Sequence, residues 1–286
     1  SQKYEEAIYF DSRCTPAYLK YADIYKSANA GLAIEKLNQL KTLEPSNTAI
    51  DKKLAEIYYL KNDFSKAADA YSRFAMGPTA NEEDLVKYAF ALFLNHDFAK
   101  SLEVANMGLK KNPRHAAFNR LAMYNNTDLK RFEEALKAAD VFFNECDKAD
   151  YSYLDYMYYG HLLEELKKYD EAVGQYEKAV ELDPTKTDLY KNISSAYEQK
   201  NDYKKAIGAY HKYYSSLEKE KQTPDLQFQL GRLYYGAGTQ PDSLTINAEE
   251  RKQALMSADS VFQVISEAAP DSYLGNFWRA RANSAL

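Results

Sequence analysis

The sequence predicts an all-α protein, an α-solenoid of stacked helix-turn-helix units. Three observations predict it: a small residue that recurs at a nearly fixed interval, a second small residue in each period, and turn-forming residues between them. The first series consists of Ala33, Ala67, Ser101, Ala135, Ala172, Ala206 and Ala258. Its intervals are 34, 34, 34, 37, 34 and 52 residues, so one supersecondary unit repeats along most of the chain.

A second small residue precedes each member of the first series, in most cases by about twelve positions. This second series consists of Ala22, Ala55, Ala89, Ala122, Gly160, Ser194 and Gly231, and Ala280 continues it. Where the ridges of two helices interlock, a side chain larger than Ala or Ser would push the helix axes apart. Each period is therefore expected to contain two helices that cross closely.

A short turn is expected to join the two helices of each period. Residues 61–64, 95–98 and 200–203 read KNDF, NHDF and KNDY. Asn tolerates the left-handed backbone that ends a helix, and Asp can accept hydrogen bonds from the free amides that begin the next one. Proline cannot continue a helix, and it follows the second helix at Pro45, Pro113, Pro184 and Pro270. The repeating unit is thus a helical hairpin.

The clearest unit spans residues 153–186, YLDYMYYGHLLEELKKYDEAVGQYEKAVELDPTK. It resembles a tetratricopeptide repeat, a helix-turn-helix unit of about 34 residues. The family's key positions are occupied by Gly160, Ala172, Tyr176, Ala179 and Pro184. The resemblance implies a right-handed superhelix in which the first helix of each unit lines a concave groove.

We expect residues 1–286 to form a single solenoid domain, because each unit of a solenoid contacts only its neighbours. Residues 1–14 are expected to be a partial repeat, since 4–12 (YEEAIYFDS) matches 176–184 (YEKAVELDP) of a second helix. Residues 273–286 are expected to be a partial repeat within a first helix. Complete repeats are placed at about 15–47, 48–81, 82–114, 115–152, 153–186, 187–220 and 224–272.

The unit at 115–152 departs from the family pattern. It has Asn125 and Asn126 where the family prefers Tyr, and it has extra residues at 128–130 before its second helix. We therefore expect this unit to be less regular than the others.

The unit at 224–272 carries an insertion near 236–250. Gly236, Gly238 and Pro241 are expected to stop its first helix, because both residue types interrupt helices. Asn247 and Glu250 are expected to form a capping box that begins a long second helix. The insertion is either an ordinary surface loop or a lobe that contacts a partner.

Composition excludes several classes of function. The formal net charge of −5 argues against a general nucleic-acid-binding protein, which would carry a basic excess. The longest apolar run, 89–94, is far shorter than a membrane span, so no direct membrane insertion is expected. Cys14 and Cys146 lie about four units apart, so a disulfide between them is not expected.

No catalytic constellation is found in the sequence. The four His and two Cys residues lack the spacing of a metal site, and there is no glycine-rich phosphate loop and no GxSxG motif. We expect a protein that is not an enzyme and that needs no cofactor or metal. His161 lies one residue after Gly160, on the face that the family turns to its groove, and is interpreted as a polar groove residue.

The groove positions that the resemblance implies are the candidate partner-binding residues. Five of them would form an apolar patch, Val86, Phe90, Phe93, Met123 and Met157. The alternative is that Phe90 and Phe93 pack between helices, because aromatic residues at helical spacing are most often core. The complete set is Lys53, Tyr59, Val86, Lys87, Phe90, Phe93, Arg120, Met123, Met157, His161, Lys191 and Arg232.

A basic series lies beside the apolar positions, at Lys20, Lys53, Lys87 and Arg120. It could bind an acidic or carboxylate-ended peptide. The alternative is that these lysines pair with carboxylates on their own helices, as Lys53 could with Glu56. The carboxylate clamp of some family members is absent: Lys191 takes its first position, but Ser195 stands where the clamp needs Asn.

The expected function is a non-enzymatic scaffold or adaptor that binds a protein or peptide in its concave groove. The alternatives are a structural component of an envelope or secretion assembly, and an accessory domain of a longer polypeptide. Residues 258–283 resemble tetratricopeptide proteins of the Bacteroidetes cell envelope, which favours a bacterial periplasmic location over a cytoplasmic one. Self-association through the last helix, with Phe277 and Trp278, is a further expectation.

Overall fold

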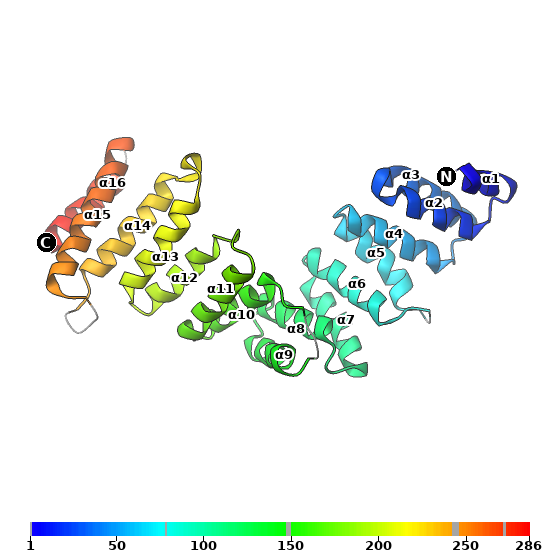
Figure 1. Ribbon diagram of the computed structural model, residues 1–286, viewed down its shortest axis with the longest axis horizontal. Coiled ribbons are helices and arrows are strands. Elements are labelled where there is room, and N and C mark those ends of the chain that lie inside the picture. The colour runs from blue at the N-terminus through cyan, green and yellow to red at the C-terminus, as the bar shows by residue number, and fades with distance from the viewer. Residues whose placement is uncertain (1, 78, 147–149, 242–245, 271–272) are drawn as a thin grey trace. The chain divides into compact units, whose positions relative to one another are not determined.

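The computed structural model describes residues 2–77, 79–146, 150–241, 246–270 and 273–286. In these ranges it contains sixteen α-helices, one short 3-10 helix and no strand, which confirms the predicted all-α class. Consecutive helices pack as antiparallel pairs stacked in chain order within each part of the chain (Figure 1). The chain divides into two compact units, Ser1–Ala149 and Asp150–Leu286. The single continuous solenoid over 1–286 stays a prediction.

Unit 1 begins with α1, which has the register of a second helix, and continues with four helical hairpins. Its helices are α1 (Gln2–Phe10), α2 (Thr15–Ala28), α3 (Ala30–Leu43), α4 (Thr48–Leu60), α5 (Phe64–Ala75), α6 (Glu82–Leu94), α7 (Phe98–Lys111), α8 (Ala116–Asp128) and α9 (Phe132–Asn144).

Unit 2 contains three hairpins followed by α16, which has the register of a first helix. Its helices are α10 (Tyr153–Glu165), α11 (Tyr169–Leu182), α12 (Leu189–Gln199), α13 (Tyr203–Ser216), the 3-10 helix η1 (Lys219–Lys221), α14 (Pro224–Gly238), α15 (Ala248–Ala268) and α16 (Tyr273–Ala285).

The small residues lie at the helix crossings, as the sequence predicts. Every member of the first series is fully buried. A Cβ added to Gly160 would lie 2.7 Å from Cε1 of Tyr176 on the paired helix, and Gly231 stands in the same relation to Phe262. Ala280 is the exception in the second series, because it is exposed while Ala282 is fully buried. The face of α16 that carries Ala280 has no second helix packed on it among the described residues.

The hairpin turns share one backbone geometry. A single residue takes a left-handed conformation, with φ of 58° at Asn62, 60° at His96 and 60° at Asn201. Lys130 and Lys167 take the same conformation in the other two turns of this kind, with φ of 57° and 59°. The extra residues at 128–130 therefore end in a turn of the ordinary geometry, so the expected irregularity is not found there.

The first helix of the inserted unit is longer than the sequence suggested. Gly236 and Gly238 do not stop α14, which runs to Gly238. Both glycines instead permit close packing, since a Cβ at either position would lie 2.4 Å from a neighbouring side chain, of Tyr203 or of Leu255. The capping box is confirmed: the Glu250 amide donates to Asn247 Oδ1 at 2.9 Å, and the 21-residue α15 follows. Residues 242–245 of the insertion lie outside the described ranges.

Three further features limit the kinds of site that can be considered. None of the described helices combines the length and the apolar character needed to cross a membrane. Within the same residues, His, Cys, Asp and Glu side chains form no group of three or more that could hold a metal ion. Cys14 and Cys146 are not joined in a disulfide.

Candidate functional site

Unit 1 has a surface groove at the predicted partner-binding positions. A cavity of about 470 Å³ lies between α4 and α6, and it brings together Tyr59, Val86, Lys87 and Phe90. Glu56 and Leu60 of α4, Lys26 of α2 and Tyr71 of α5 complete its walls. Four residues named from the sequence thus meet in one cavity. We call this cavity the unit 1 groove.

Helical spacing explains how these side chains meet. Glu56, Tyr59 and Leu60 are three and four residues apart on α4, so they lie on one face, and Val86, Lys87 and Phe90 do the same on α6. Both α4 and α6 pack on α5, which places their two faces side by side.

The exposed fractions of the lining side chains show which of them lie deep in the groove. Tyr71 is 1% exposed at the base, and Leu60 is 58% exposed at the rim. Burial raises the pKa of the Tyr59 phenol above its ordinary value. The groove therefore presents an apolar lining with a hydroxyl that can donate a hydrogen bond.

The two phenylalanines of α6 have different surroundings. Phe90 is half-buried and lines the groove. Phe93 is also half-buried, but its ring packs between helices, 5.7 Å from the ring of Phe98 on α7 and 5.5 Å from that of Tyr124 on α8. The alternative that these rings pack between helices therefore describes Phe93 better than Phe90.

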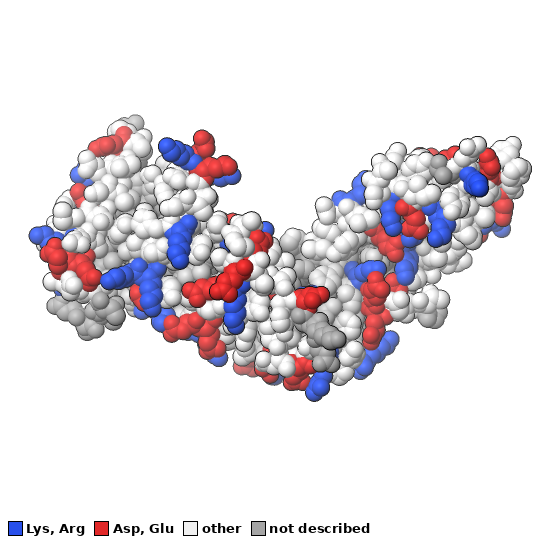
Figure 2. Space-filling view, viewed as in Figure 1, with Lys and Arg blue, Asp and Glu red and all other residues white. Residues whose placement is uncertain are grey.

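Two members of the basic series, Lys53 and Lys87, are paired with carboxylates. Lys53 Nζ lies 2.9 Å from Asp23 Oδ1 and 2.7 Å from Glu56 Oε2, and Lys87 Nζ lies 2.7 Å from Glu83 Oε1. Burial acts to lower the pKa of Lys53, but its hydrogen bonds to Glu56 and Asp23 outweigh burial and raise it. Basic and acidic side chains are intermixed over the face in view (Figure 2). For these two lysines, pairing with carboxylates fits the geometry better than a basic series that is available to bind an acidic peptide.

The two candidate residues on α8, Arg120 and Met123, are less accessible to a partner than the residues that line the unit 1 groove. Met123 is fully buried, so its place in an exposed apolar patch is wrong. Neighbours on α6, α7 and α9 pack around α8, and residues 121–127 are all buried. Arg120 is half-buried, with its guanidinium 5.1 Å from the ring centre of Phe142.

The burial of α8 explains its unusual Asn residues. Asn125 is fully buried and donates from Nδ2 to Oγ of Ser101 at 2.8 Å. Ser101 in turn donates to the carbonyl oxygen of Ala89 at 2.8 Å. Ser101 is the one polar member of the first small-residue series. Its hydroxyl links α8 to α6 through α7.

The four candidates in unit 2 lie on three first helices, α10, α12 and α14. Met157 on α10 is half-buried against the core of the unit, and His161 on the same helix is exposed. Lys191 is exposed, with Nζ 5.3 Å from the ring centre of Tyr213. Arg232 is exposed and lies 3.9 Å from Oε1 of Glu198. These residues remain candidates, and none of them lines the pocket that is described next.

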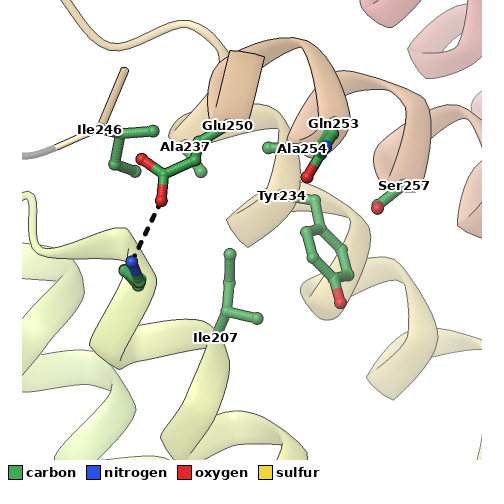
Figure 3. Close-up of a pocket in the computed structure, with 9 residues that line it drawn as sticks. Ile207, Tyr234, Ala237, Ile246, Glu250, Gln253, Ala254 and Ser257 are labelled. Carbon is green, nitrogen blue, oxygen red and sulfur yellow. Dashed lines mark hydrogen bonds and ion pairs between the residues drawn. The ribbon is translucent and has the colours of Figure 1, made fainter. Parts of the chain in front are cut away.

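Unit 2 has a pocket at a place that the sequence did not indicate. It has a volume of about 230 Å³ and lies between the second helices α13 and α15, over α14 (Figure 3). Ile207, Tyr234, Ala237, Ile246 and Ala254 supply its apolar lining. The only signal in the sequence was the insertion, which supplies Ile246 and the start of α15. We call this cavity the insertion pocket.

Comparisons with known proteins agree with this architecture. The sequence model of the tetratricopeptide repeat family matches residues 154–186. No curated protein matches the sequence. A solved structure of the C-terminal part of a TPR repeat-containing protein from Cytophaga hutchinsonii is 27% identical, with a TM-score of 0.54 over 70% of both chains.

Two further solved structures are more distant in sequence. A tetratricopeptide repeat protein from Parabacteroides merdae is 17% identical, with a TM-score of 0.59 over 99% of both chains. MamA from Desulfovibrio magneticus RS-1, from residue 41 to its end, is 18% identical, with a TM-score of 0.53 over 62% of this chain and 97% of that one. At these identities the likeness concerns the fold alone.

The fold defines the class of protein: a helical repeat protein built from stacked pairs of helices. The predicted resemblance to tetratricopeptide repeat proteins is confirmed, by the match at 154–186 and by the solved tetratricopeptide repeat structures. Repeat proteins of this kind use extended concave surfaces to bind other proteins, and the fold is typically not catalytic.

Proposed function

We propose that the protein is a non-enzymatic scaffold that binds a protein or peptide partner in the unit 1 groove. The observation that supports this most directly is the cavity of about 470 Å³ that contains four of the sequence-named residues. Recognition sites are concave and mostly apolar, with a few polar groups that set orientation. Tyr59, Val86 and Phe90 supply the apolar part, and Lys26, Glu56 and Lys87 supply the polar part.

The partner of this groove is recognised mainly by apolar contact. The groove lysines already have carboxylate neighbours, since Asp23 lies 3.3 Å from Lys26 and Glu83 lies 2.7 Å from Lys87. Such partly exposed pairs contribute little and are screened by salt. Binding that depends weakly on salt is therefore expected, which argues against a strongly acidic peptide or a nucleic acid as the partner.

A site-specific crosslink tests the groove directly. Leu60 is 58% exposed at the groove rim, and Leu182 is 52% exposed on α11 of unit 2 and does not line the groove. A photoreactive amino acid at position 60 should give a discrete covalent adduct with a protein in cells that express the chain. The same residue at position 182 is the matched control. An adduct that forms at 182 and not at 60 would count against the groove.

The two phenylalanines of α6 supply the mutational test with the crosslinked partner. Phe90→Ser should weaken binding by about 2 kcal/mol or more, as expected of an interface anchor, with a modest effect on the melting temperature. Phe93→Ser should mainly lower the melting temperature, because its ring packs on Phe98 and Tyr124. If Phe90→Ser binds normally while the fold survives, the groove is not the binding site.

A role as a structural component of a cell-envelope assembly is the second candidate function. The supporting observation is that two structures of similar fold come from Bacteroidetes, Cytophaga and Parabacteroides. Fractionation of cells from the source organism, with an antibody against the chain, tests a periplasmic location. Recovery with cytoplasmic markers alone would exclude an envelope role.

Self-association through α16 would fit such an assembly. Trp278 packs on the preceding hairpin, 5.7 Å from the ring of Phe262 and 5.2 Å from that of Tyr235. On the same helix Tyr273 remains 77% exposed and Phe277 48% exposed. Sedimentation at rising concentration should show association that Phe277→Ser reduces. A mass that stays monomeric throughout would rule it out.

A further inference from the structure

We propose that the insertion pocket is a second binding site, which takes one uncharged apolar side chain from a partner protein. The pocket lies on the second helices of unit 2 and on the insertion, so it is separate from the unit 1 groove and does not depend on it. Four steps support the proposal: how the pocket is built, how large it is, which charges line it, and which hydrogen-bonding groups lie beside its apolar lining.

The pocket exists because small residues leave space between α13 and α15. Ala237 on α14 and Ala254 on α15 line it with methyl groups only. Ile246, from the insertion, closes one end. An ordinary hairpin of this family lacks the insertion and would not supply that wall.

The volume of the pocket limits what it can hold. An apolar protein cavity of about 150 Å³ stays dry and binds benzene. The insertion pocket, at about 230 Å³, has room for one phenyl ring or one branched aliphatic group. It is smaller than the range of about 300–1,000 Å³ in which whole small-molecule ligands bind. A single side chain therefore fits it better than a metabolite or a cofactor.

The charges around the pocket favour an uncharged occupant. Two charged side chains line it, and they pair with each other, Lys204 Nζ lying 3.1 Å from Glu250 Oε1 (Figure 3). Glu250 also accepts a hydrogen bond from the backbone amide of Asn247 at 3.1 Å. The phenol oxygen of Tyr234 lies 2.7 Å from Nε2 of His211, so this polar end already has a partner. A charged guest would have to break one of these interactions.

Two polar side chains on α15 favour a peptide over a hydrocarbon. Ser257 and Gln253 line the pocket on that side, next to Ala254. A hydroxyl and an amide can exchange hydrogen bonds with the backbone of a segment that carries the guest side chain. Gln253 Nε2 donates to Glu249 Oε1 at 3.4 Å, and its amide has a second donor hydrogen and an acceptor oxygen for a peptide backbone, whereas a free hydrocarbon would use neither.

Blocked amino acids test the proposal with defined probes. In protein labelled at the isoleucine methyl groups, N-acetyl-phenylalaninamide and N-acetyl-leucinamide should shift the signals of Ile207 and Ile246 saturably. The methyl signals of Ile50 and Ile57, which are fully buried in unit 1, should stay unchanged. The charged probes N-acetyl-lysinamide and N-acetyl-aspartamide should produce no saturable shift. Equal binding of charged and apolar probes, or no binding of the apolar probes, would overturn the proposal.

A variant with a filled pocket gives the matched control. Ala254→Phe should occupy the space and abolish the saturable shift, while Ala268→Phe, exposed at the end of the same helix, should leave it unchanged. Circular dichroism checks that both variants keep their helices, and Ala254→Leu replaces the larger change if Ala254→Phe unfolds. Binding that persists in a folded, filled variant would contradict the proposal. Binding of benzene without the blocked amino acids would show a hydrocarbon site instead, and would also overturn it.

Discussion

Gly160 and Gly174 lie in the same hairpin and should respond in opposite ways to the same substitution. A Cβ at Gly160 would lie 2.7 Å from Cε1 of Tyr176, a fully buried ring whose hydroxyl donates to Glu164 at 2.8 Å. Gly160→Ala should therefore destabilise the protein by about 1–3 kcal/mol, the usual cost of overpacking. At Gly174 a Cβ has no neighbour within 4 Å, so Gly174→Ala should stabilise by about 1 kcal/mol. Urea unfolding of both variants checks this, and shifts of the same sign would contradict it.

Tyr210 should make the protein less stable in alkali. Burial, with a smaller contribution from the neighbouring Tyr213, raises the pKa of Tyr210 to about 12, and its hydroxyl donates to the carbonyl oxygen of Leu226. An unfolded tyrosine ionises near pH 10. The unfolded state thus loses its proton first, so the stabilisation is complete below pH 10 and is lost as the pH rises towards 12. Between pH 9 and 11, denaturant midpoints should fall less for Tyr210→Phe than for the native chain.

Single residues could be predicted from the sequence where local spacing decides their environment. The small residues and the groove residues Tyr59, Val86 and Phe90 follow from position in the repeat. Met123 could not be placed in this way, since its burial depends on α6, α7 and α9 packing around α8. Phe90 and Phe93 have similar sequence contexts, and only the positions of Phe98 and Tyr124 distinguish them.

At the scale of the element, the buried carboxylate of Asp51 joins three helices. It lies on α4, is 1% exposed, and accepts hydrogen bonds from Lys41 Nζ of α3 at 2.5 Å and Arg73 Nε of α5 at 2.8 Å. Asp51→Asn removes the charge that both cations contact, and it should cost about 2 kcal/mol, in the range of hydrogen bonds to charged groups.

The matched control for Asp51 is Asp69→Asn, at an exposed position on α5. Its effect should stay within about 0.5 kcal/mol, as for most surface substitutions. Thermal unfolding compares the two variants directly. Equal effects would mean that Asp51 does not tie the helices together.

The helices themselves were largely predictable, because turn residues and capping residues act locally. Asn62, Asn201 and the Asn247 capping box follow this rule. Lys130 and Lys167 occupy the same left-handed position without a favourable side chain, so only the packing of their hairpins reveals it. Gly236 shows the opposite case, since its role is close packing on Tyr203 and not the end of a helix.

At the scale of the whole molecule, damage to one repeat should remain local. Ala172 is fully buried between α10 and α11, so Ala172→Leu should overpack this crossing and cost about 1–3 kcal/mol. Each repeat of a solenoid contacts only its neighbours. Hydrogen exchange should therefore accelerate in α10, α11 and α12 and stay unchanged in α15 and α16. Uniform acceleration along the chain would indicate a single cooperative unit.

The order of paired helices within each unit follows the order that the sequence predicted, because each repeat carries its own signals. The division into Ser1–Ala149 and Asp150–Leu286 could not be predicted, since no change of composition marks it. The insertion pocket could not be predicted from the sequence either. It needs Ile207, Tyr234 and Ala254, which come from three different helices, and their meeting depends on tertiary packing.

The hydrogen bond between Asn125 and Ser101 also restricts how this array of repeats can evolve. Repeats can be duplicated, deleted or exchanged when their contact surfaces are equivalent, as they are where Ala meets an aromatic ring. Here the buried Asn125 amide requires the hydroxyl of Ser101 in the preceding repeat. An alanine at position 101, the residue that the other repeats carry there, would leave that amide buried without its partner. The repeats at 82–114 and 115–152 are thus expected to be inherited as a pair, since a recombination event that separates them would leave the buried Asn125 amide without the hydroxyl of Ser101.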